Sequence, residues 1–361
     1  MQKILNYIGG EFQEAISGKL LDNVDPSVGK VYSTLPDSAA ADVDLAVRAS
    51  KKAFADWAGM PVENRSKLLN KLADLMERDL EKLALAECID NGKPLWLARE
   101  TDIPRAISNF RFFAAAAQTF THESSGVANR FLNYTLRQPV GIIGCISPWN
   151  LPLYLITWKI APALATGNCV IAKPSEITPM TAFVLCELAE EAGIPAGVLN
   201  MVHGLGGSVG EALSAHPEIK AISFTGGTVT GRKVAATAAP LFKKLSLELG
   251  GKNPNVIFAD CDFDKMIATT VRSSFQNQGQ ICLCGSRILI EKEIYEKFKT
   301  AFVAEVKQLK LGDPLEESSR QGAIVSKVQY EKVLACIELA KQEGGIILCG
   351  GKAIQPVGRC A

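Results

Sequence analysis

The residue in this sequence best suited to covalent chemistry is Cys282, which follows a Gly-Gln turn within Phe275–Arg287 (FQNQGQICLCGSR). A thiolate is the side chain best able to attack a carbonyl carbon near neutral pH. Most cysteines in apolar surroundings are inert core residues, however, so Cys282 alone does not indicate a catalytic role.

Two other residues could support such a nucleophile. Glu248 stands in Leu245–Pro254 (LSLELGGKNP), just before two glycines. A glutamate held in an apolar strand can have a raised pKa suited to general-base work, although the alternation in LSLEL also allows a solvent-facing position. Asn150 ends the loop Ser147–Asn150 (SPWN). Its amide could donate to a developing oxyanion or serve as an ordinary turn residue.

Three further segments could bind a nucleotide. Phe224–Gly231 (FTGGTVTG) predicts a strand end, a glycine turn and a helix start, and Gly204–Gly207 closes an earlier unit similarly. Glycines let the backbone approach a phosphate, and a helix N-terminus supplies free N–H groups. Lys173–Glu176 (KPSE) follows an apolar strand, where α/β sheets bind ligands, and could contact ribose hydroxyls. Taken singly, each segment is better explained as a plain turn.

The elements that position these residues alternate between strand and helix from Val140 onward. Apolar spacing predicts helices at 41–57, 68–76 and 103–118, and 130–137 (RFLNYTLR) predicts a strand. The later alternation indicates a parallel sheet with helices on both faces. Its strands are expected at 141–147, 169–173, 198–203 and 221–225, its helices at 152–165 and 179–192, and a second region at 245–249, 288–290, 295–311 and 346–348.

In this order, SPWN, KPSE, FTGGTVTG, LELGGKNP and GQICLCGSR make the chain resemble the aldehyde dehydrogenase superfamily over essentially its whole length. The last two motifs, with 34 residues from Glu248 to Cys282, are highly specific as a pair. The resemblance implies an α/β fold whose NAD-binding domain, residues 1–119 and 140–247, contains a Rossmann-type parallel sheet. It also implies a catalytic α/β domain, 248–361, with its C-terminal part missing, and a strand-bearing arm, 120–139, through which family members form homo-oligomers.

The resemblance also implies roles for single residues. Cys282 is expected to be the nucleophile, Glu248 the general base, and Asn150 the oxyanion-stabilising amide beside the Cys282 main-chain N–H. The expected cofactor is NAD and the expected substrate a small aldehyde. The residues expected at the cofactor are Ser147, Pro148, Trp149, Lys173, Ser175, Glu176, Gly206, Gly210, Phe224, Thr225, Gly226, Gly227, Thr228 and Leu249.

Two features depart from the family's pattern. Many members carry serine at the position of Gly227, so one hydroxyl contact to phosphate would be absent. The chain also ends at Ala361, before the family's EEIFGPV-like motif, whose glutamate holds the nicotinamide ribose. We therefore expect the 361-residue chain to be inactive or nearly so. The alternative to an enzyme is a catalytically inactive shortened form that acts as a binding or regulatory protein.

A narrower resemblance, to 2-aminomuconic semialdehyde dehydrogenases, rests on Asp102–Arg105, the FRFFA run at Phe110–Ala114 and the GQICLCGSR site. Arg105 matches a position that lines the substrate tunnel and is usually apolar elsewhere in the family. A guanidinium there could bind a substrate carboxylate bidentately, which makes 2-aminomuconate semialdehyde the expected substrate. A surface arginine on a solvated helix is the alternative.

Composition and spacing exclude several other classes. The net charge is +1 with both signs interspersed, so neither nucleic acid nor a membrane surface is an expected partner. The ten cysteines contain no zinc-type CxxC pair, so no metal site is expected. A cysteine hydrolase is disfavoured because the three histidines lie far from Cys282 in sequence. The chain shows no targeting pattern and no apolar span, which predicts a cytoplasmic protein.

Overall fold

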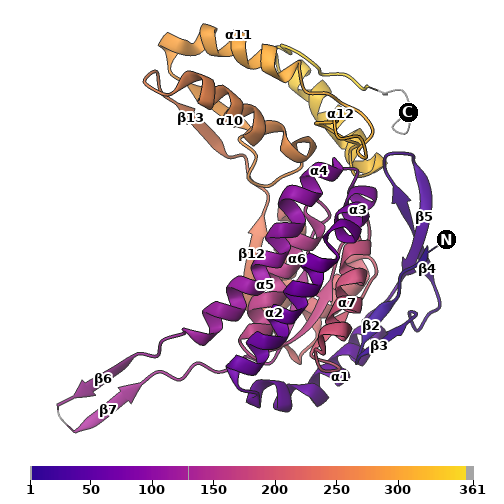
Figure 1. The fold of residues 1–361 in the computed structure, drawn as a ribbon, viewed down its shortest axis with the longest axis vertical. Helices are drawn as coiled ribbons and strands as arrows, with labels where there is room; N and C mark the ends of the chain where they lie inside the picture. The colour runs from indigo at the N-terminus through magenta and orange to yellow at the C-terminus, as the bar shows by residue number, and fades with distance from the viewer. Residues whose placement is uncertain (1, 129, 355–361) are drawn as a thin grey trace.

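The computed structural model describes residues 2–128 and 130–354. Figure 1 shows a large body that contains most of the helices, a smaller lobe formed by the chain after β12 (Lys244–Leu249), and a two-stranded arm that projects away from the body. Helix and strand thus alternate through most of the chain, as the sequence predicts for an α/β fold.

A seven-stranded sheet forms the centre of the body. Its strands follow the order β12-β11-β8-β9-β10-β2-β3, in which the run from β12 to β10 is parallel and β2 and β3 are antiparallel additions. Apart from β12, these strands are β11 (Ile219–Gly226), β8 (Ile142–Ile146), β9 (Cys169–Lys173), β10 (Leu199–Met201), β2 (Asn6–Ile8) and β3 (Glu11–Gln13).

Helices cover both faces of this sheet because its central strands are apolar on both sides. In β8, Ile143 and Cys145 join the core on one face, whereas Ile142 and Ile146 join the core on the other. This arrangement follows from the side-chain period of two along a strand. The helices that cover the first face are α2 (Val62–Arg78), α3 (Leu80–Asn91), α5 (Ile103–Gln118), α6 (Pro152–Ala165) and α7 (Met180–Ala192). The helices that cover the second face are α1 (Ala40–Gly59), α8 (Glu211–Ala215) and α9 (Thr228–Ala238).

Helix α5 shows how the apolar spacing in the sequence determines the packing. Its buried residues Ile103, Ala106, Ile107, Phe110 and Ala114 lie on one helical face, which contacts α2 and α6. Arg105 and Phe112 lie on the opposite, exposed face. The predicted helix 103–118 is therefore confirmed with its bounds, and the other predicted helices of the body are confirmed with small shifts at their ends.

The smaller lobe contains a second, two-stranded parallel sheet, formed by β13 (Pro254–Ile257) and β14 (Arg287–Ile290). Ile257, Ile267 and Phe298 form its core. The lobe's helices are α10 (Phe263–Phe275), α11 (Tyr295–Val306) and α12 (Lys327–Gln342). Short helical segments elsewhere are α4 (Leu95–Leu97), η1 (Ala98–Asp102), η2 (Gly206–Gly210), η3 (Ala239–Leu241), η4 (Gln276–Gly279) and η5 (Lys292–Ile294).

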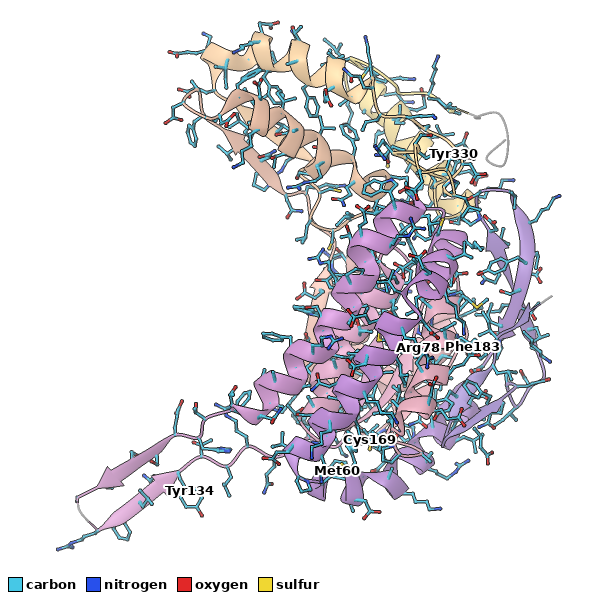
Figure 2. The ribbon with its side chains drawn as sticks, viewed as in Figure 1. Met60, Arg78, Tyr134, Cys169, Phe183 and Tyr330 are labelled. Carbon is cyan, nitrogen blue, oxygen red and sulfur yellow. The ribbon has the colours of Figure 1, made fainter. Side chains whose placement is uncertain are left out.

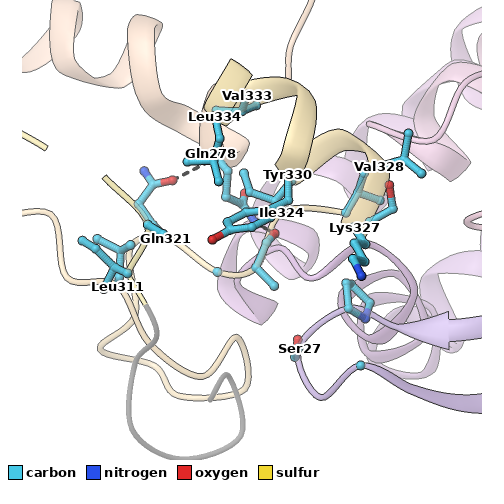
Figure 3. Close-up of a pocket in the computed structure, with 18 of the residues that line it drawn as sticks. Ser27, Gln278, Leu311, Gln321, Ile324, Lys327, Val328, Tyr330, Val333 and Leu334 are labelled. Atoms are coloured by element: carbon cyan, nitrogen blue, oxygen red, sulfur yellow. Dashed lines mark hydrogen bonds between the residues drawn. The ribbon is translucent and has the colours of Figure 1, made fainter. Parts of the chain in front are cut away.

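A cavity of about 1230 Å³ lies between this lobe and the N-terminal strands. Those strands, β1 (Gln2–Lys3), β4 (Leu20–Asp25) and β5 (Lys30–Pro36), form a separate small sheet. Figure 3 shows Val328, Tyr330 and Leu334 of α12 beside the cavity, with Ser27 of the β4–β5 turn on its other side. Of the site residues predicted from the sequence, only Glu176 lines this cavity, so it is not the candidate site.

The arm consists of β6 (Ser124–Val127) and β7 (Phe131–Tyr134), paired in antiparallel fashion. Figure 2 shows Tyr134 on the arm, well away from the body. Phe131, Leu132 and Tyr134 are 70%, 68% and 63% exposed. The predicted strand 130–137 is thus confirmed over Phe131–Tyr134, and its apolar side chains face solvent in this chain.

Two expectations about the chain's elements are wrong. Strand 245–249 does not open the second region, because β12 pairs with β11 from Ala221↔Lys244 to Gly226↔Leu249 and forms an edge of the main sheet. The strand expected at 346–348 is not formed among the described residues, and its side chains are exposed because no neighbouring strand pairs with them. The expected division into domains stays a prediction.

Among the helices that the structure describes, none combines the length and the apolar character needed to cross a lipid bilayer.

A buried histidine close to the main sheet makes the stability of the fold depend on pH. His203 follows β10, is 1% exposed, and has no hydrogen-bond partner for either ring nitrogen among the described residues. Burial, aided by the nearby Lys173, lowers the pKa of His203 from 6.5 to about 3. The folded protein therefore keeps the ring neutral, whereas the unfolded chain takes up a proton as the pH falls below 6.5.

We expect this contribution to the free energy of unfolding to be complete above the unfolded pKa and lost as the pH falls toward the folded pKa, at roughly 1.4 kcal/mol per pH unit. His203→Met removes the titrating ring at similar volume and should weaken the pH dependence of the urea midpoint between about pH 7 and about pH 5. His122→Gln, which removes an exposed histidine, is the control. Equal pH dependence in the wild type and His203→Met would contradict the prediction.

Candidate active site

The loops that follow β11, β8 and β9 lie side by side because these strands are parallel neighbours in the sheet. Ser147–Asn150 follows β8, Lys173–Glu176 spans the end of β9, and Gly226–Thr228 leads from β11 into α9. Leu249 ends β12 opposite Gly226. The carboxyl ends of parallel strands are where open α/β sheets bind ligands. The fold thus brings together motifs that are far apart in the sequence.

A fixed amine and a carboxylate stand at one part of this edge. Lys173 Nζ donates to the Pro174 carbonyl at 2.8 Å and pairs with Glu176 Oε2 at 3.1 Å. Burial lowers the pKa of Lys173, and the charge of Glu176 opposes that effect. Lys173 is buried whereas Glu176 is half-exposed, so the pair presents a donor and an acceptor at the rim of the sheet. Such a pair suits a ligand that bears several hydroxyl groups.

The start of α9 offers a second part of the site. Gly227 is the N-cap residue, and a Cβ added there would meet no described atom within 4 Å. A Cβ at Gly231 would lie 2.5 Å from Leu249 Cδ2, so α9 packs closely on β12 here and a larger residue would displace the Leu249 side chain. Gly227 and Thr228 at the start of the helix are exposed, and the free N–H groups of a helix N-terminus suit a phosphate.

The other residues expected at the cofactor lie along the same edge of the sheet. Gly206 and Gly210 bound η2, which follows β10. Ser147, Ser175, Phe224, Thr225 and Gly210 are buried, Pro148, Trp149, Gly226 and Leu249 are half-buried, and Gly206 and Thr228 are exposed.

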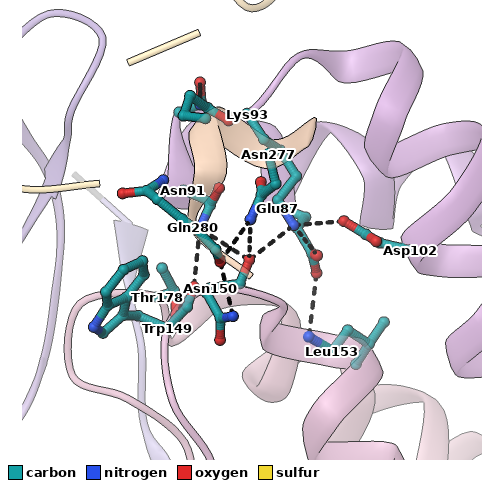
Figure 4. Close-up of polar contacts among 12 residues, drawn as sticks. Glu87, Asn91, Lys93, Asp102, Trp149, Asn150, Leu153, Thr178, Asn277 and Gln280 are labelled. Carbon is teal, nitrogen blue, oxygen red and sulfur yellow. Dashed lines mark hydrogen bonds and ion pairs between the residues drawn. The ribbon is translucent and has the colours of Figure 1, made fainter. Parts of the chain in front are cut away.

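The side chain of Asn150 is tied to the segment that carries the cysteine. Asn150 Nδ2 donates to the Gln280 carbonyl at 2.9 Å (Figure 4). Gln280 precedes Cys282 by two residues, so the amide and the thiol are carried by segments in direct contact. The body supplies the amide, and the chain after β12 supplies the thiol.

Cys282 is half-buried in a loop whose main-chain carbonyls accept hydrogen bonds from the Asn253 side chain. Asn253 Nδ2 donates to the Cys282 carbonyl at 2.6 Å and to the Cys284 carbonyl at 3.3 Å. Cys284 is buried, and burial raises the pKa of its thiol. Burial also raises the pKa of Cys145 and Cys169 to about 12. Near neutral pH these three thiols stay protonated, which leaves Cys282 as the accessible thiol beside Asn150.

Glu248 is exposed, which is the solvent-facing alternative that the sequence left open. The reason is its strand: β12 is an edge of the sheet, and its side chains alternate between half-buried and exposed near the C-terminal end. Glu248 lies opposite Thr225 in the register. Lys159 Nζ donates to Thr225 Oγ1 at 2.6 Å, and burial lowers the pKa of Lys159 while Cys145 and Glu248 oppose that effect.

Arg105 lies beside aromatic rings on α6, the helix that begins just after Asn150. Its guanidinium stands 4.4 Å from the centre of the Tyr154 ring. Trp158 lies one turn further along α6, with its ring 6.0 Å from that of Tyr154. Asn109 Nδ2 donates to the Tyr154 carbonyl at 3.1 Å and so holds α5 against α6. The arginine is exposed, and its contact with the ring leaves donors available to an anion.

Sequence reasoning missed several residues that hold the site together. Asn253 stands within the quoted LELGGKNP motif, and Asn277 stands five residues before the cysteine. Lys159 and Lys93 were not singled out, although each is a lysine that the fold buries. Lys159 could have been found as the one charged residue within the apolar helix PLYLITWKIAPALA.

Comparison with known proteins agrees with this arrangement. The model of the aldehyde dehydrogenase family matches residues 12–360. The 2-aminomuconic semialdehyde dehydrogenase of Danio rerio is 54% identical over 346 residues, which cover 96% of this chain and 71% of that protein. The Homo sapiens protein of the same name is 50% identical with the same coverage. The 2-aminomuconic 6-semialdehyde dehydrogenase of a Pseudomonas species is 44% identical, covering 97% of this chain and 72% of that protein.

Solved structures show the same fold. An NAD+ complex of an aldehyde dehydrogenase from Bacillus cereus superposes with a TM-score of 0.97 at 38% identity, covering 99% of this chain and 73% of that one. A mutant indole-3-acetaldehyde dehydrogenase from P. syringae, in complex with NAD+ and IAA, superposes with a TM-score of 0.96 at 35% identity and covers 98% of this chain and 72% of that one. From the family match, these identities and the shared fold we conclude that this chain belongs to the aldehyde dehydrogenase family.

Proposed function

We propose that this protein oxidises an aldehyde to a carboxylic acid, with Cys282 as the nucleophile and NAD as the hydride acceptor. The observation that carries the proposal is the hydrogen bond from the Asn150 amide to the Gln280 carbonyl. It places the predicted oxyanion donor against the segment of the predicted nucleophile. Membership of the aldehyde dehydrogenase family supplies the class of substrate.

The first step is attack by the Cys282 thiolate on the aldehyde carbon. A C–S bond forms, and the carbonyl oxygen becomes an oxyanion. The Asn150 amide and the Cys282 main-chain N–H stabilise that charge. Loss of one oxyanion donor typically raises a barrier by ~3 kcal/mol, so removing the Asn150 amide should slow acylation by roughly a hundredfold or more.

The second half of the reaction releases the acid. The C–H bond breaks with its electron pair, and the carbonyl re-forms as a thioester on Cys282. When bound, NAD supplies the acceptor for that hydride. Glu248 then takes a proton from a water that attacks the thioester carbon, and the C–S bond breaks to regenerate the thiolate. The exposure of Glu248 gives it access to water.

The residues at the sheet edge fit a dinucleotide. Glu176 and Lys173 would bind ribose hydroxyls, and the open start of α9 at Gly227 would take the pyrophosphate. The Bacillus cereus and P. syringae relatives are NAD+ complexes, and their shared fold supports NAD as the cofactor here.

The substrate we propose is an aldehyde that also carries a carboxylate, specifically 2-aminomuconate semialdehyde. The names of the Danio rerio, Homo sapiens and Pseudomonas relatives support this choice. In this chain Arg105 would bind the carboxylate through the donors that the Tyr154 ring leaves free. The rings of Tyr154 and Trp158 would exclude water from that ion pair and strengthen it.

The arm formed by β6 and β7 would join subunits into a homo-oligomer. Its exposed apolar side chains support this proposal, because a monomer in water gains nothing from exposing them. A second copy that covered Phe131, Leu132 and Tyr134 would remove apolar area from water.

Variants of Cys282 and Glu248 test the proposed chemistry, and they are made in a background extended to the length of the relatives, of which this chain covers 71%. Cys282→Ala should abolish NADH formation, because both covalent steps need the thiolate. Glu248→Gln should release a burst of about one NADH per active site and then stall at the thioester. Rapid-mixing absorbance of NADH measures both results. Cys284→Ala, which removes the neighbouring buried thiol, is the control and should still turn over; steady turnover by Glu248→Gln would place the base elsewhere.

Cofactor preference tests the role of Glu176. We expect a higher kcat/KM with NAD than with NADP, because the carboxylate accepts from ribose hydroxyls and repels a 2′-phosphate. Glu176→Gln should reduce this preference. Glu187→Gln, which removes an exposed carboxylate paired with Lys82, should not. Equal turnover of the wild type with both cofactors would show that Glu176 does not select between them.

Arg105→Ala tests the preference for an acidic substrate. It should raise KM for 2-aminomuconate semialdehyde roughly tenfold to a hundredfold, since hydrogen bonds to charged groups contribute about 1.5–3 kcal/mol. KM for acetaldehyde, which has no carboxylate, should change little. Arg111→Ala is the matched control: it removes an equal charge from the same helix, where the arginine pairs with Asp74 at 3.0 Å. Equal changes in KM for both aldehydes would show that Arg105 does not bind the substrate carboxylate.

A further inference from the structure

The main-chain carbonyl of Asn150 is held by buried side chains from two parts of the fold. Asn277 Nδ2 donates to it at 2.9 Å, Lys93 Nζ at 3.3 Å and Asn91 Nδ2 at 3.5 Å, so Asn277 makes the shortest of these contacts (Figure 4). We propose that Asn277 is a positioning residue that sets the Asn150 amide against the Cys282 segment. This proposal rests on the proposed function, because it takes Asn150 as the donor to an oxyanion formed at Cys282.

The two segments are joined by a reciprocal pair of hydrogen bonds. Asn150 donates from its side chain to the Gln280 carbonyl at 2.9 Å, and Asn277 donates from its side chain to the Asn150 carbonyl at the same distance. Asn277 Nδ2 also lies 3.4 Å from the Gln280 carbonyl. Both partners are acceptors, so the amide of Asn277 must present its NH₂ group to them. A change at Asn277 therefore shifts Asn150 relative to the cysteine.

The backbone at Asn277 adopts a conformation that few side chains tolerate. Its φ is 54°, the φ of Gln278 is 56°, and Gly279 continues at 70°. A non-glycine residue in this left-handed region costs about 1–3 kcal/mol, and asparagine tolerates it better than most. The strained turn ends three residues before Cys282, so it determines where the cysteine segment begins.

Burial also argues against a purely structural role. Asn277 is 1% exposed, and its Oδ1 has no hydrogen-bond partner among the described residues. A buried, unsatisfied amide oxygen is unfavourable by about 1–3 kcal/mol. Glycine would relieve both this cost and the backbone strain. What asparagine adds is its contact with the Asn150 carbonyl.

On its other side, the Asn150 carbonyl faces a fully buried ion cluster. Lys93 Nζ pairs with Glu87 at 2.9 Å and with Asp102 at 2.5 Å. Burial disfavours the ammonium, but the two carboxylates outweigh it and raise the pKa of Lys93. Truncating one member would leave a buried charge unpaired and destabilise the fold. Asn277 is therefore the position at which placement of Asn150 can be tested apart from folding.

Two reactions of the Cys282 thiol distinguish a displaced Asn150 amide from a generally disordered loop. Attack on p-nitrophenyl acetate forms a C–S bond and an oxyanion, and then expels p-nitrophenolate. Attack on iodoacetamide forms a C–S bond and expels iodide, with no oxyanion. Neither reaction needs a cofactor. Because Cys336 is also exposed, the alkylation rate of Cys282 is taken as the rate that is lost in Cys282→Ser. The Asn150 amide assists only the first reaction, so the ratio of the two rate constants reports its position.

Asn277→Gly removes the donor and accepts the left-handed backbone. It should slow acylation by p-nitrophenyl acetate roughly tenfold to a hundredfold, since a misplacement of about 1 Å can cost about a hundredfold, and should leave alkylation unchanged. Gln278→Gly is the matched control. Gln278 has the same backbone conformation, but its amide donates to the carbonyls of Gly92 and Ala323 at 3.1 and 2.8 Å, so the ratio should stay at the wild-type value.

Asn277→Ala removes the donor without placing a charge against the two carbonyls, and it provides the test if the glycine variant does not fold. It should show the same selective loss of acylation. Unchanged acylation in a folded variant, or an equal fall in both rates, would overturn the proposal. Cys282→Ser separates this result from the proposed function. If it keeps both reactions at the wild-type rate, the nucleophile lies elsewhere, and the proposed function and the positioning role both fail.

Discussion

The need to bury β8, β9 and β11 on both faces is the constraint on which the rest of the structure depends. Each strand carries apolar side chains to two helical layers, as Ile142 and Ile143 do from adjacent positions. Polar groups can therefore leave the sheet only at the strand ends. Because the strands are parallel, their carboxyl ends meet at one edge, and Asn150 and Lys173 are brought close there by the topology rather than by any contact between them.

The site is completed across the junction between the body and the smaller lobe. Ala323 N donates to the Gly92 carbonyl at 2.9 Å, and Trp96 Nε1 donates to the Ser319 carbonyl at 2.8 Å. These bonds hold residues 319–323 of the lobe against the C-cap of α3 and against α4. Cys282 and Asn150, the proposed nucleophile and the proposed oxyanion donor, lie on different sides of this junction. The position of Cys282 relative to Asn150 therefore depends on how the body and the smaller lobe pack together.

Much of this could be predicted from the sequence, because periodicity and motif order are local signals. Helix α5 was predictable to its ends from its apolar spacing. Asn277 was not, since its contact with Asn150 joins residues 127 positions apart. The exposure of Glu248 was not predictable either, because LSLEL fits both an edge and a central strand until the strand order is known. The prediction of a strand at 346–348 was wrong for the same reason, because a strand forms only where a neighbouring strand can pair with it.

The position of β12 at the edge of the sheet has a consequence for motion. Among the described residues, β12 is paired with β11 alone, whereas β8 is paired on both sides. Amides in a strand held from one side open to solvent at a lower free energy than those held from both, so hydrogen exchange should be faster along β12 than along β8. The strand that leads to Asn150 thus belongs to the slowly opening part of the sheet. β12, which carries Glu248, is therefore expected to open locally without loosening the strands beside it.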